Sequence, residues 1–242
     1  MHRFIFKIEQ VLGFRFPIPE KWRWQLSISS EVAFWDNYYR TKGGDWKNKY
    51  QLKFDPNLEV QPNISKYFPS SANLKILDVG AGPMTFLGKI FSGQKINITA
   101  TDPLADQYDE VLGKYEIDPL VRTIKCHGEK LDGMFDESTF DVVLAKNSID
   151  HSYDPVKVIV NMIKLTKDKV ILIHAENEAD NESWYGLHQW NFFVENGDFI
   201  ISGRQTKVNF SAKYKNVVHI DSFIDEIDGL LYVVMTKKNS FK

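Results

Sequence analysis

The sequence predicts an α/β protein built on a doubly wound, mostly parallel sheet. Short apolar runs of strand length recur between residues 74 and 174, and segments of helical character separate them. This alternation is typical of consecutive βαβ units, because parallel strands need a crossover connection between them. The first run also leads directly into a glycine-rich turn, as in sheets that bind ligands beyond the carboxyl ends of their strands.

Each element follows from the local pattern of side chains. Runs of apolar or β-branched residues predict parallel strands at Leu74–Val79, Ile96–Thr101, Leu120–Cys126, Phe140–Lys146 and Lys169–His174. Helices are predicted between strands at Met84–Phe91, 105–115 and Pro155–Leu165. In the last of these, the apolar residues lie mostly on one side. Further strand-like runs after residue 190 predict an antiparallel edge at Phe199–Ser202, Lys207–Phe210 and Leu230–Thr236.

The composition is that of a folded, soluble protein. Of 242 residues, 43% are hydrophobic and 26% are charged, which argues against disorder. Thirty basic residues against 32 acidic ones give a net charge of −2, so broad nucleic-acid binding is not expected. The single cysteine, Cys126, can form neither an internal disulfide nor a multi-cysteine metal site. A reducing, cytoplasmic location is the simplest expectation.

The first sixteen residues mix Phe and Ile with charged side chains. Arg3, Lys7, Glu9 and Arg15 interrupt the apolar stretch, which is therefore too short for a signal peptide or a transmembrane helix. We expect Met1–Phe16 to form an amphipathic helix packed on the domain. A helix that lies on a membrane surface or binds a partner is the alternative.

Residues 1–70 are predicted to form an aromatic-rich N-terminal cap or lid, and residues 71–242 the main domain. The aromatic side chains that could close over a ligand and exclude water are Phe34, Trp35, Tyr38, Tyr39 and Trp46. Gly43 and Gly44 would then serve as a hinge. Simple packing of these rings against the sheet is the alternative.

The turn after the first strand reads Asp78-Val79-Gly80-Ala81-Gly82. Its glycines allow a tight turn and close approach of a ligand. Thr85 stands where the dinucleotide fingerprint has its third glycine. Asp102 ends the next strand, 22 residues after Gly80, where an acid can accept hydrogen bonds from ribose hydroxyls. The combination favours a nucleoside without a diphosphate, although a tight structural connection is the alternative.

These residues resemble those of a known enzyme family. The DVGAG turn, the acid that ends the next strand, and the run FDVVLAKNSIDHSYDP resemble the Rossmann-like (class I) S-adenosylmethionine-dependent methyltransferases, over roughly residues 74–175. The resemblance implies a seven-stranded sheet with a helical N-terminal cap, S-adenosyl-L-methionine as cofactor, and a cofactor-binding domain over residues 71–242. Pro83 and Met84 depart from the pattern, because many members have a further glycine there.

The resemblance also implies which residues bind the cofactor, all of them in turns that follow strands. They are Asp78, Gly80, Ala81 and Gly82 for the methionine part, Asp102 for the ribose, Pro103 and Leu104 for the adenine ring, Gly128 and Glu129 for the adenine amino group, and Lys146 and Asn147 for the reactive end.

A narrower resemblance concerns the acceptor. The runs NSIDHSYDP and HAENEADNESWYGLHQWNF resemble methyltransferases encoded with bacterial surface-glycan (capsule or O-antigen) genes. This implies a sugar or sugar-linked acceptor, methylated at oxygen, in polysaccharide biosynthesis. Trp184, Tyr185 and Trp190 interleave with polar side chains, a mixture that suits a sugar ring. A helix that caps the core is the alternative reading of this segment.

A hydroxyl acceptor needs a positioned base to take its proton, and histidine is the usual choice. The candidates are His151, which has Asp150 beside it and ranks first, His174 at the end of a strand, and His188. Each has a structural alternative: packing at a helix start, a buried bond to a backbone carbonyl, or the opening of a helix. Asp154, which precedes Pro155, is interpreted as a helix cap.

No metal site is predicted. The acidic run Glu176, Glu178, Asp180 and Glu182 could hold Mg²⁺, but such loops are more often simply solvated. Two other functions stay open. Asp78 and Thr85 count against a nicotinamide-dependent oxidoreductase. The intact glycine turn and Asp102 count against a catalytically inactive methyltransferase-fold binding subunit.

Overall fold

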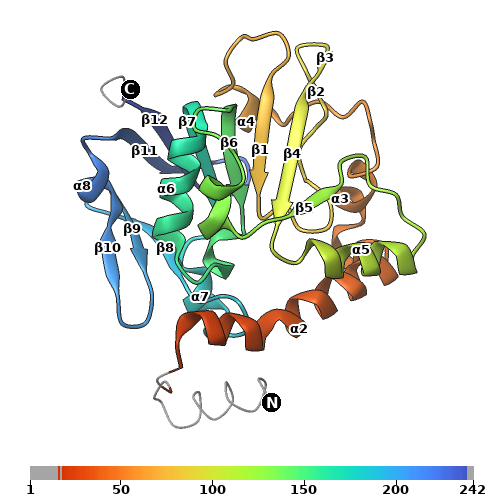
Figure 1. Ribbon diagram of the computed structural model, residues 1–242, viewed down its shortest axis with the longest axis horizontal. Coiled ribbons are helices and arrows are strands. Elements are labelled where there is room, and N and C mark those ends of the chain that lie inside the picture. Colours follow the sequence, from red (N-terminus) through yellow and green to blue (C-terminus); the bar gives the residue numbers. More distant parts are fainter. Residues whose placement is uncertain (1–15, 17, 239–242) are drawn as a thin grey trace.

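The computed structural model describes residue 16 and residues 18–238, so the helix expected over Met1–Phe16 lies outside the described residues apart from Phe16. A seven-stranded sheet forms the centre (Figure 1), in the order β11-β12-β7-β6-β1-β4-β5. Its strands are β1 (Lys75–Val79), β4 (Asn97–Asp102), β5 (Thr123–Lys125), β6 (Phe140–Lys146), β7 (Thr166–His174), β11 (Val218–Ile224) and β12 (Leu231–Lys237). The first five pair in parallel, whereas β12 is antiparallel to both of its neighbours. The doubly wound, mostly parallel sheet is confirmed.

Successive residues of the central strands alternate between two apolar layers, because side chains along a strand point to opposite faces. Leu77, Val143 and Leu172 pack on the face covered by α6 (Pro155–Leu165). Their neighbours in sequence pack on the other face, with Ile64 of α4 (Pro62–Ser65). Burial on both faces fixes the register of these strands, since a slip of one residue would exchange the layers.

The helix predicted over Met84–Phe91 is absent: residues 84–89 are irregular chain with bends, and a short strand begins at Ile90. The amides of Lys89 and Ile90 donate to the carbonyl of Leu58, and β2 (Ile90–Phe91) pairs with β3 (Gln94–Lys95). A Cβ on Gly88 would lie only 2.2 Å from the carbonyl carbon of Glu59. Glycine therefore permits the close approach of residues 58–60, and this long-range pairing overrides local helical preference.

The C-terminal third differs from the predicted edge in part. Leu231–Lys237 does form antiparallel pairs in the main sheet, and β11 beside it was not predicted. The runs expected at residues 199–202 and 207–210 instead belong to a separate three-stranded sheet. That sheet consists of β8 (Asn191–Glu195), β9 (Asp198–Ser202) and β10 (Lys207–Asn209), followed by α8 (Phe210–Tyr214). Hairpin pairing over sequence distances this short needs no place in the central sheet.

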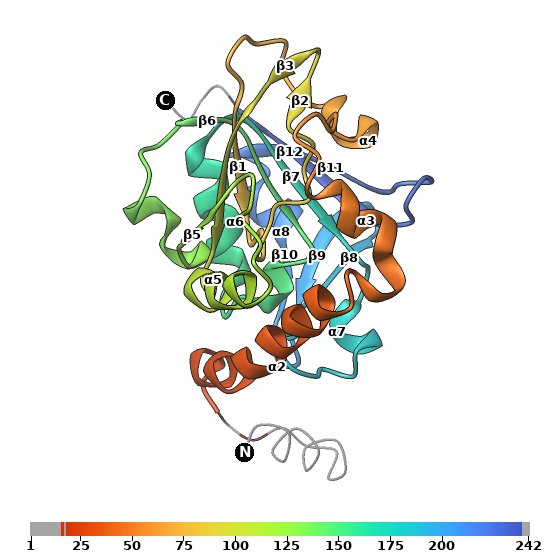
Figure 2. The same ribbon diagram turned by 90° about the vertical axis from the view of Figure 1, so that its right-hand side faces the viewer.

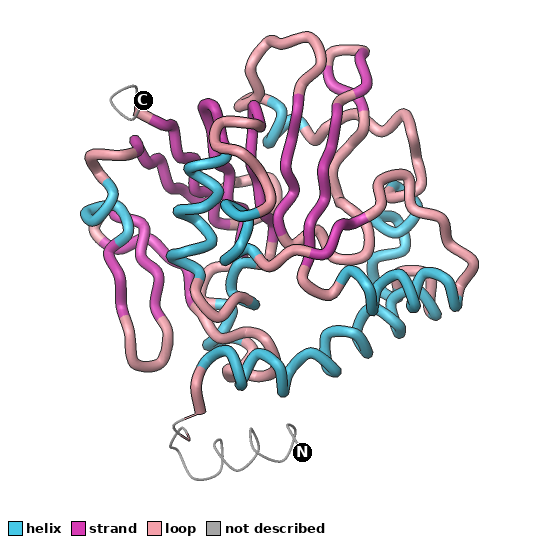
Figure 3. Tube along the Cα trace, viewed as in Figure 1, coloured by secondary structure: helices cyan, strands magenta, loops and turns pink. Residues whose placement is uncertain are grey.

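The N-terminal segment lies across the carboxyl ends of the strands. Helix α2 (Glu20–Arg40) runs past the ends of β1 and β4 and beside α5 (Ala105–Lys114), and α3 (Lys47–Leu52) follows it (Figures 1 and 2). Loops lie between the strand ends and α2 (Figure 3). Tyr38 and Tyr39 are buried against α5, whereas Phe34 and Trp46 are 45% and 49% exposed. No helix in the described part of the chain is both long and apolar enough to cross a membrane.

Candidate active site

The glycine turn is held against two other segments. Gly80 and Gly82 have φ of 70° and 64°, in the left-handed region that favours glycine. A Cβ on Gly80 would lie 2.4 Å from Cβ of Ser148, and one on Gly82 would lie 2.9 Å from Cζ2 of Trp35. The turn therefore touches the loop after β6 on one side and helix α2 on the other.

Asp102 is directed at this turn. Its Oδ2 accepts a hydrogen bond from the amide of Gly82 at 3.1 Å, and its Oδ1 accepts one from the amide of Leu104 at 2.9 Å. Burial raises the pKa of Asp102 to about 7, against the lowering effect of the Leu104 amide, and the Glu31 carboxylate adds to the rise. Each carboxylate oxygen has a second lone pair, so Asp102 can still accept from a ligand hydroxyl.

Asp78, in β1, leads into the same turn, and only one of its two carboxylate oxygens has a hydrogen-bond partner among the residues that the structure describes. Its Oδ2 accepts a hydrogen bond from the hydroxyl of Thr85 at 2.6 Å. Its Oδ1 is buried and has no partner in the described part of the chain. Burial raises the pKa of Asp78 to about 6, although the Thr85 hydroxyl and nearby lysines lower it. An orphaned buried carboxylate oxygen calls for an explanation, and a cationic ligand group would supply one.

The remaining residues predicted to bind the cofactor have local partners. Leu104 is buried against Tyr108 and Trp24. Glu129 Oε1 accepts the amides of Tyr153 and Asp154 at 2.9 and 3.2 Å. The other five lie as follows: the amide of Ala81 donates to the carbonyl of Thr101 at 3.0 Å, Pro103 is half-buried beside Asp102, a Cβ on Gly128 would lie 2.7 Å from Val158, Lys146 Nζ lies 4.9 Å from the centre of the Phe86 ring, and Asn147 Oδ1 accepts the amide of Ala175 at 3.1 Å. Contacts of these residues with an adenine ring stay predictions.

The structure brings together all four residues predicted to act in catalysis. Asp150 is fully buried at the centre. His174 Nε2 donates to its Oδ1 at 2.8 Å, and His188 Nδ1 donates to its Oδ2 at 2.7 Å. His151 Nε2 lies 3.6 Å from Asp150 Oδ2 and 3.2 Å from His188 Nδ1. Burial raises the pKa of Asp150, but the three histidines outweigh this effect and hold that pKa well below its usual range.

Both ring nitrogens of His174 already have hydrogen-bond partners. Its Nδ1 faces the carbonyl oxygen of Ala175 at 2.9 Å and Glu178 Oε2 at 3.3 Å, and its Nε2 faces Asp150. Oxygen atoms face both nitrogens, so neither nitrogen is left over for a ligand hydroxyl. Burial lowers the pKa of His174, but Asp150 outweighs this and raises it overall.

Within the cluster around Asp150, His188 and His151 are the two histidines that reach solvent. His188 is 25% exposed and His151 is 19% exposed. Since Nδ1 of His188 donates to Asp150, its Nε2 is the nitrogen left to accept a proton. Burial lowers the pKa of His188, but the Asp150 carboxylate overcomes this and raises it to about 9.

Two charged residues outside the expected set also face this edge. Glu31 of α2 accepts a hydrogen bond from Trp35 Nε1 at 2.8 Å, and its Oε2 lies 3.9 Å from His151 Nδ1. Lys53, just after α3, donates to the carbonyl of Met84 at 2.8 Å. Both were missed because they lie in the cap, far in sequence from the turns that follow the strands. No local pattern indicates that α2 and α3 approach the edge.

Two groups of side chains could ligate a metal ion: Asp150, His151 and His188, and Asp150, His174 and Glu178. In each group the ligand atoms lie within 4.8 Å of one another. Both oxygens of Asp150 already accept hydrogen bonds from histidines, so these bonds account for the arrangement without an ion. We assign no metal here.

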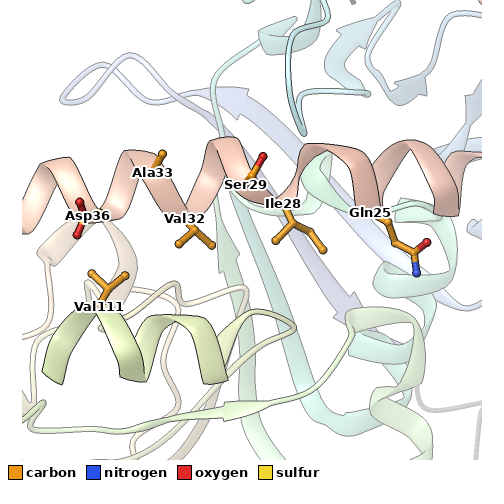
Figure 4. A pocket seen from close by; sticks show the side chains of 7 residues that line it. All are labelled: Gln25, Ile28, Ser29, Val32, Ala33, Asp36 and Val111. Carbon is orange, nitrogen blue, oxygen red and sulfur yellow. The ribbon is translucent and has the colours of Figure 1, made fainter. Parts of the chain in front are cut away.

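A shallow groove of about 580 Å³ lies between α2 and α5 (Figure 4). Its walls include Ile28 and Val32 of α2 and Val111 of α5. None of the residues predicted to bind the cofactor or to act in catalysis lines this groove. It borders the candidate site, because Ile28 and Val32 pack on the cluster that contains Leu104.

Comparison with known proteins supports a methyltransferase. Residues 77–174 match the family model of a methyltransferase domain. A candidate S-adenosyl-L-methionine-dependent methyltransferase of Methanococcus maripaludis has a similar structure, with a TM-score of 0.53 and 10% identity over 86% of this chain and 94% of that one. The PH0226 protein of Pyrococcus horikoshii gives a TM-score of 0.48 and 15% identity over 84% and 99%. The matched segment runs from the first central strand through His174.

The fold is therefore the Rossmann-like methyltransferase fold, with its seven-stranded sheet. The domain match and the fold together support S-adenosylmethionine as the cofactor. The matched range contains the glycine turn, Asp102 and Asp150, whereas Glu31, Lys53 and His188 lie outside it.

Proposed function

We propose that the chain is an S-adenosylmethionine-dependent methyltransferase that methylates a hydroxyl oxygen of a sugar or sugar-linked acceptor in surface-polysaccharide biosynthesis. The observation that carries this proposal is the contact between the glycine turn and the loop that holds Asp150. Ser148 donates to the carbonyl of Val79 at 3.0 Å and lies against Gly80. The histidine cluster therefore adjoins the turn that would hold the cofactor.

The residues at this turn fit the proposed cofactor. The orphaned Asp78 oxygen suits an α-ammonium group, and Asp102 retains lone pairs for ribose hydroxyls. Trp35 forms the wall on the side of the cap. When bound, S-adenosylmethionine supplies an electrophilic methyl group on a positively charged sulfur.

The histidine cluster would prepare the acceptor. We assign the base to His188, because Asp150 fixes its Nδ1–H and leaves Nε2 to take the hydroxyl proton. Asp150 then faces the imidazolium that forms and stabilises it. The buried His174 ring bonds the other oxygen of Asp150, so the carboxylate cannot turn away from His188. His151, the first candidate from sequence, lies 3.2 Å from His188 and is the second candidate for the base.

The sugar class rests on the resemblance of residues 147–155 and 174–192 to surface-glycan methyltransferases. Aromatic side chains lie in the second segment: Trp184 Nε1 donates to Asp180, and Trp190 Nε1 donates to the carbonyl of Ser152. The second bond holds the Trp190 ring close to the loop after β6, whereas the first fixes Trp184 within its own segment. Flat apolar rings beside polar groups favour a sugar ring over an extended apolar acceptor.

Calorimetry with S-adenosylhomocysteine and with NAD tests the cofactor. We expect binding of the first and none of the second, and the reverse result would replace the proposal with an oxidoreductase. Mass spectrometry after incubation with S-adenosylmethionine and a panel of nucleotide sugars tests the acceptor. A mass gain of one methyl group on a sugar hydroxyl is expected. Methylation of amine acceptors alone would contradict it.

A further inference from the structure

Three lysines surround Asp78 at the glycine turn. Lys53 follows α3, Lys89 lies before β2, and Lys146 ends β6. Lys53 Nζ donates to the Met84 carbonyl, Lys89 Nζ donates to the Leu87 carbonyl, and Lys146 lies over the Phe86 ring. In the part of the chain that the structure describes, no ion pair within 4.0 Å joins any of the three to a carboxylate.

Lys53 is the least compensated of the three. Asp55 attracts Lys89, and Asp228 attracts Lys146, in addition to Asp78. Lys53 is attracted by Asp78 alone and is repelled by both other lysines. Burial lowers the pKa of Lys53 to about 8, so its charge is costly where it stands. A half-buried ammonium with so little opposite charge is expected to have an anionic partner.

We propose that Lys53 binds the α-carboxylate of the methionine part of S-adenosylmethionine while Asp78 Oδ1 accepts from its α-ammonium group. The two side chains would together recognise an amino-acid zwitterion, with one charge supplied by the cap and the other by the central sheet. The inference rests on the proposed function, because it needs the cofactor to lie at the glycine turn.

The position of Lys53 supports this assignment. Its acceptor, Met84, lies just beyond the turn, two residues after Gly82. Its Nζ lies 5.5 Å from the centre of the Trp35 ring, and that ring covers Gly82. Lys89 and Lys146 are turned toward other groups. Lys53 lies outside the matched residues 77–174, so the cap would be part of the cofactor site and not only a cover.

Two ligands separate the amino-acid tail from the nucleoside. S-adenosylhomocysteine has the tail, and 5′-methylthioadenosine has the same nucleoside and sulfur without it. Calorimetry would measure the Kd of both for the wild-type chain, for Lys53→Met and for Lys49→Met, an exposed lysine of α3 that serves as the matched control. We expect Lys53→Met to raise the Kd of S-adenosylhomocysteine by about 10- to 100-fold, as for a lost charged hydrogen bond. The Kd of methylthioadenosine should stay within about twofold of the wild-type value. Lys49→Met should change neither.

Other outcomes overturn the inference. Equal loss for both ligands would give Lys53 a structural role, and unchanged affinity would mean that it does not touch the tail. Where Lys53→Met does not fold, as judged by thermal unfolding, Lys53→Gln provides the same comparison, because its amide can still donate to the Met84 carbonyl. If the wild-type chain binds neither ligand, the proposed function itself is wrong.

Discussion

The two halves of the carboxyl edge are built in different ways. The half that would hold the cofactor uses residues close in sequence: Gly80 and Gly82 follow β1, and Asp102 ends β4, the neighbouring strand. The histidine half gathers Asp150, His174 and His188 from a loop, a strand end and a segment beyond the matched domain. A short motif can therefore specify the first half, whereas only the folded chain assembles the second.

The two halves also tune carboxylates in opposite directions. Burial raises the pKa of Asp78 to about 6 and that of Asp102 to about 7. Asp150 is just as buried, yet the histidines hold its pKa well below the usual range. The first half can bind hydroxyl and ammonium groups from a ligand, because its carboxylates keep unused lone pairs. The second half has its partners built in, which suits proton transfer.

The largest expected effect belongs to the histidine half. His188→Ala should lower kcat by roughly 10²–10⁴-fold, because the acceptor hydroxyl would lose its base. The Kd of S-adenosylhomocysteine should stay unchanged, since the two halves are separate in function. Steady-state kinetics and calorimetry on the same preparation measure both quantities.

Two matched variants make that result specific. His219→Ala removes an exposed histidine of β11 and should leave kcat unchanged. His151→Ala tests the second candidate. If His151→Ala abolishes turnover while His188→Ala does not, the role of base passes to His151. If neither lowers kcat, the histidine half has no catalytic role, and the comparison of the two halves fails.

The pH dependence of kcat is the second test. The pKa of His188 is raised to about 9, so the base is mostly protonated at neutral pH. The rate should rise roughly tenfold per pH unit up to about pH 9 and then level off. The raised pKa of His188 also stabilises the folded state. This contribution is fully present below pH 6.5 and is lost as the pH rises through about 9. A rate that is flat between pH 6 and pH 9 would contradict His188 as the base.

The cofactor half should respond in binding and not in chemistry. Asp102→Ala removes the acceptor that we propose for the ribose hydroxyls and leaves two backbone amides unpaired, which should cost about 1.5–3 kcal/mol of cofactor affinity. Asp106→Ala, an exposed acid in the first turn of α5, is the control and should have no effect. Calorimetry with S-adenosylhomocysteine decides between them. Equal affinities for the wild-type chain and the Asp102 variant would show that Asp102 does not bind the ribose.

The same contrast explains how far the sequence could predict the fold. Strands β1, β6 and β7 were predicted closely because each contains an apolar run that is buried on both faces. Strand β4, NITATD, is less apolar and was predicted from its β-branched residues. The helix predicted at residues 84–91 was wrong because the segment pairs with Leu58, about 30 residues away, and the local sequence does not indicate that partner. Periodicity reports burial, but it does not report which segment provides the cover.

The candidate site divides in the same way. Parallel strands present their carboxyl ends at one edge, so Asp150, His174 and the glycine turn could be placed together from sequence. His188 was a candidate only because it lies in an acceptor-like segment, and its bond to Asp150 needed the structure. Glu31 and Lys53 could not be foreseen, because nothing in residues 20–53 indicates which face of the cap meets the sheet. The choice among three histidines also needed hydrogen-bond partners, which no spacing supplies.

The smallest effect separates architecture from chemistry within a single loop. Asp154 follows His151 by three residues, but its Oδ1 accepts the amide of Lys157 at 3.0 Å and caps α6. Asp154→Ala should lower the free energy of unfolding by about 1 kcal/mol and leave kcat and cofactor affinity unchanged. Asp154→Ser, which can still cap the helix, should restore most of the stability. Chemical denaturation measures the first quantity, and a drop in kcat at unchanged stability would place Asp154 in the reaction instead of in the helix start.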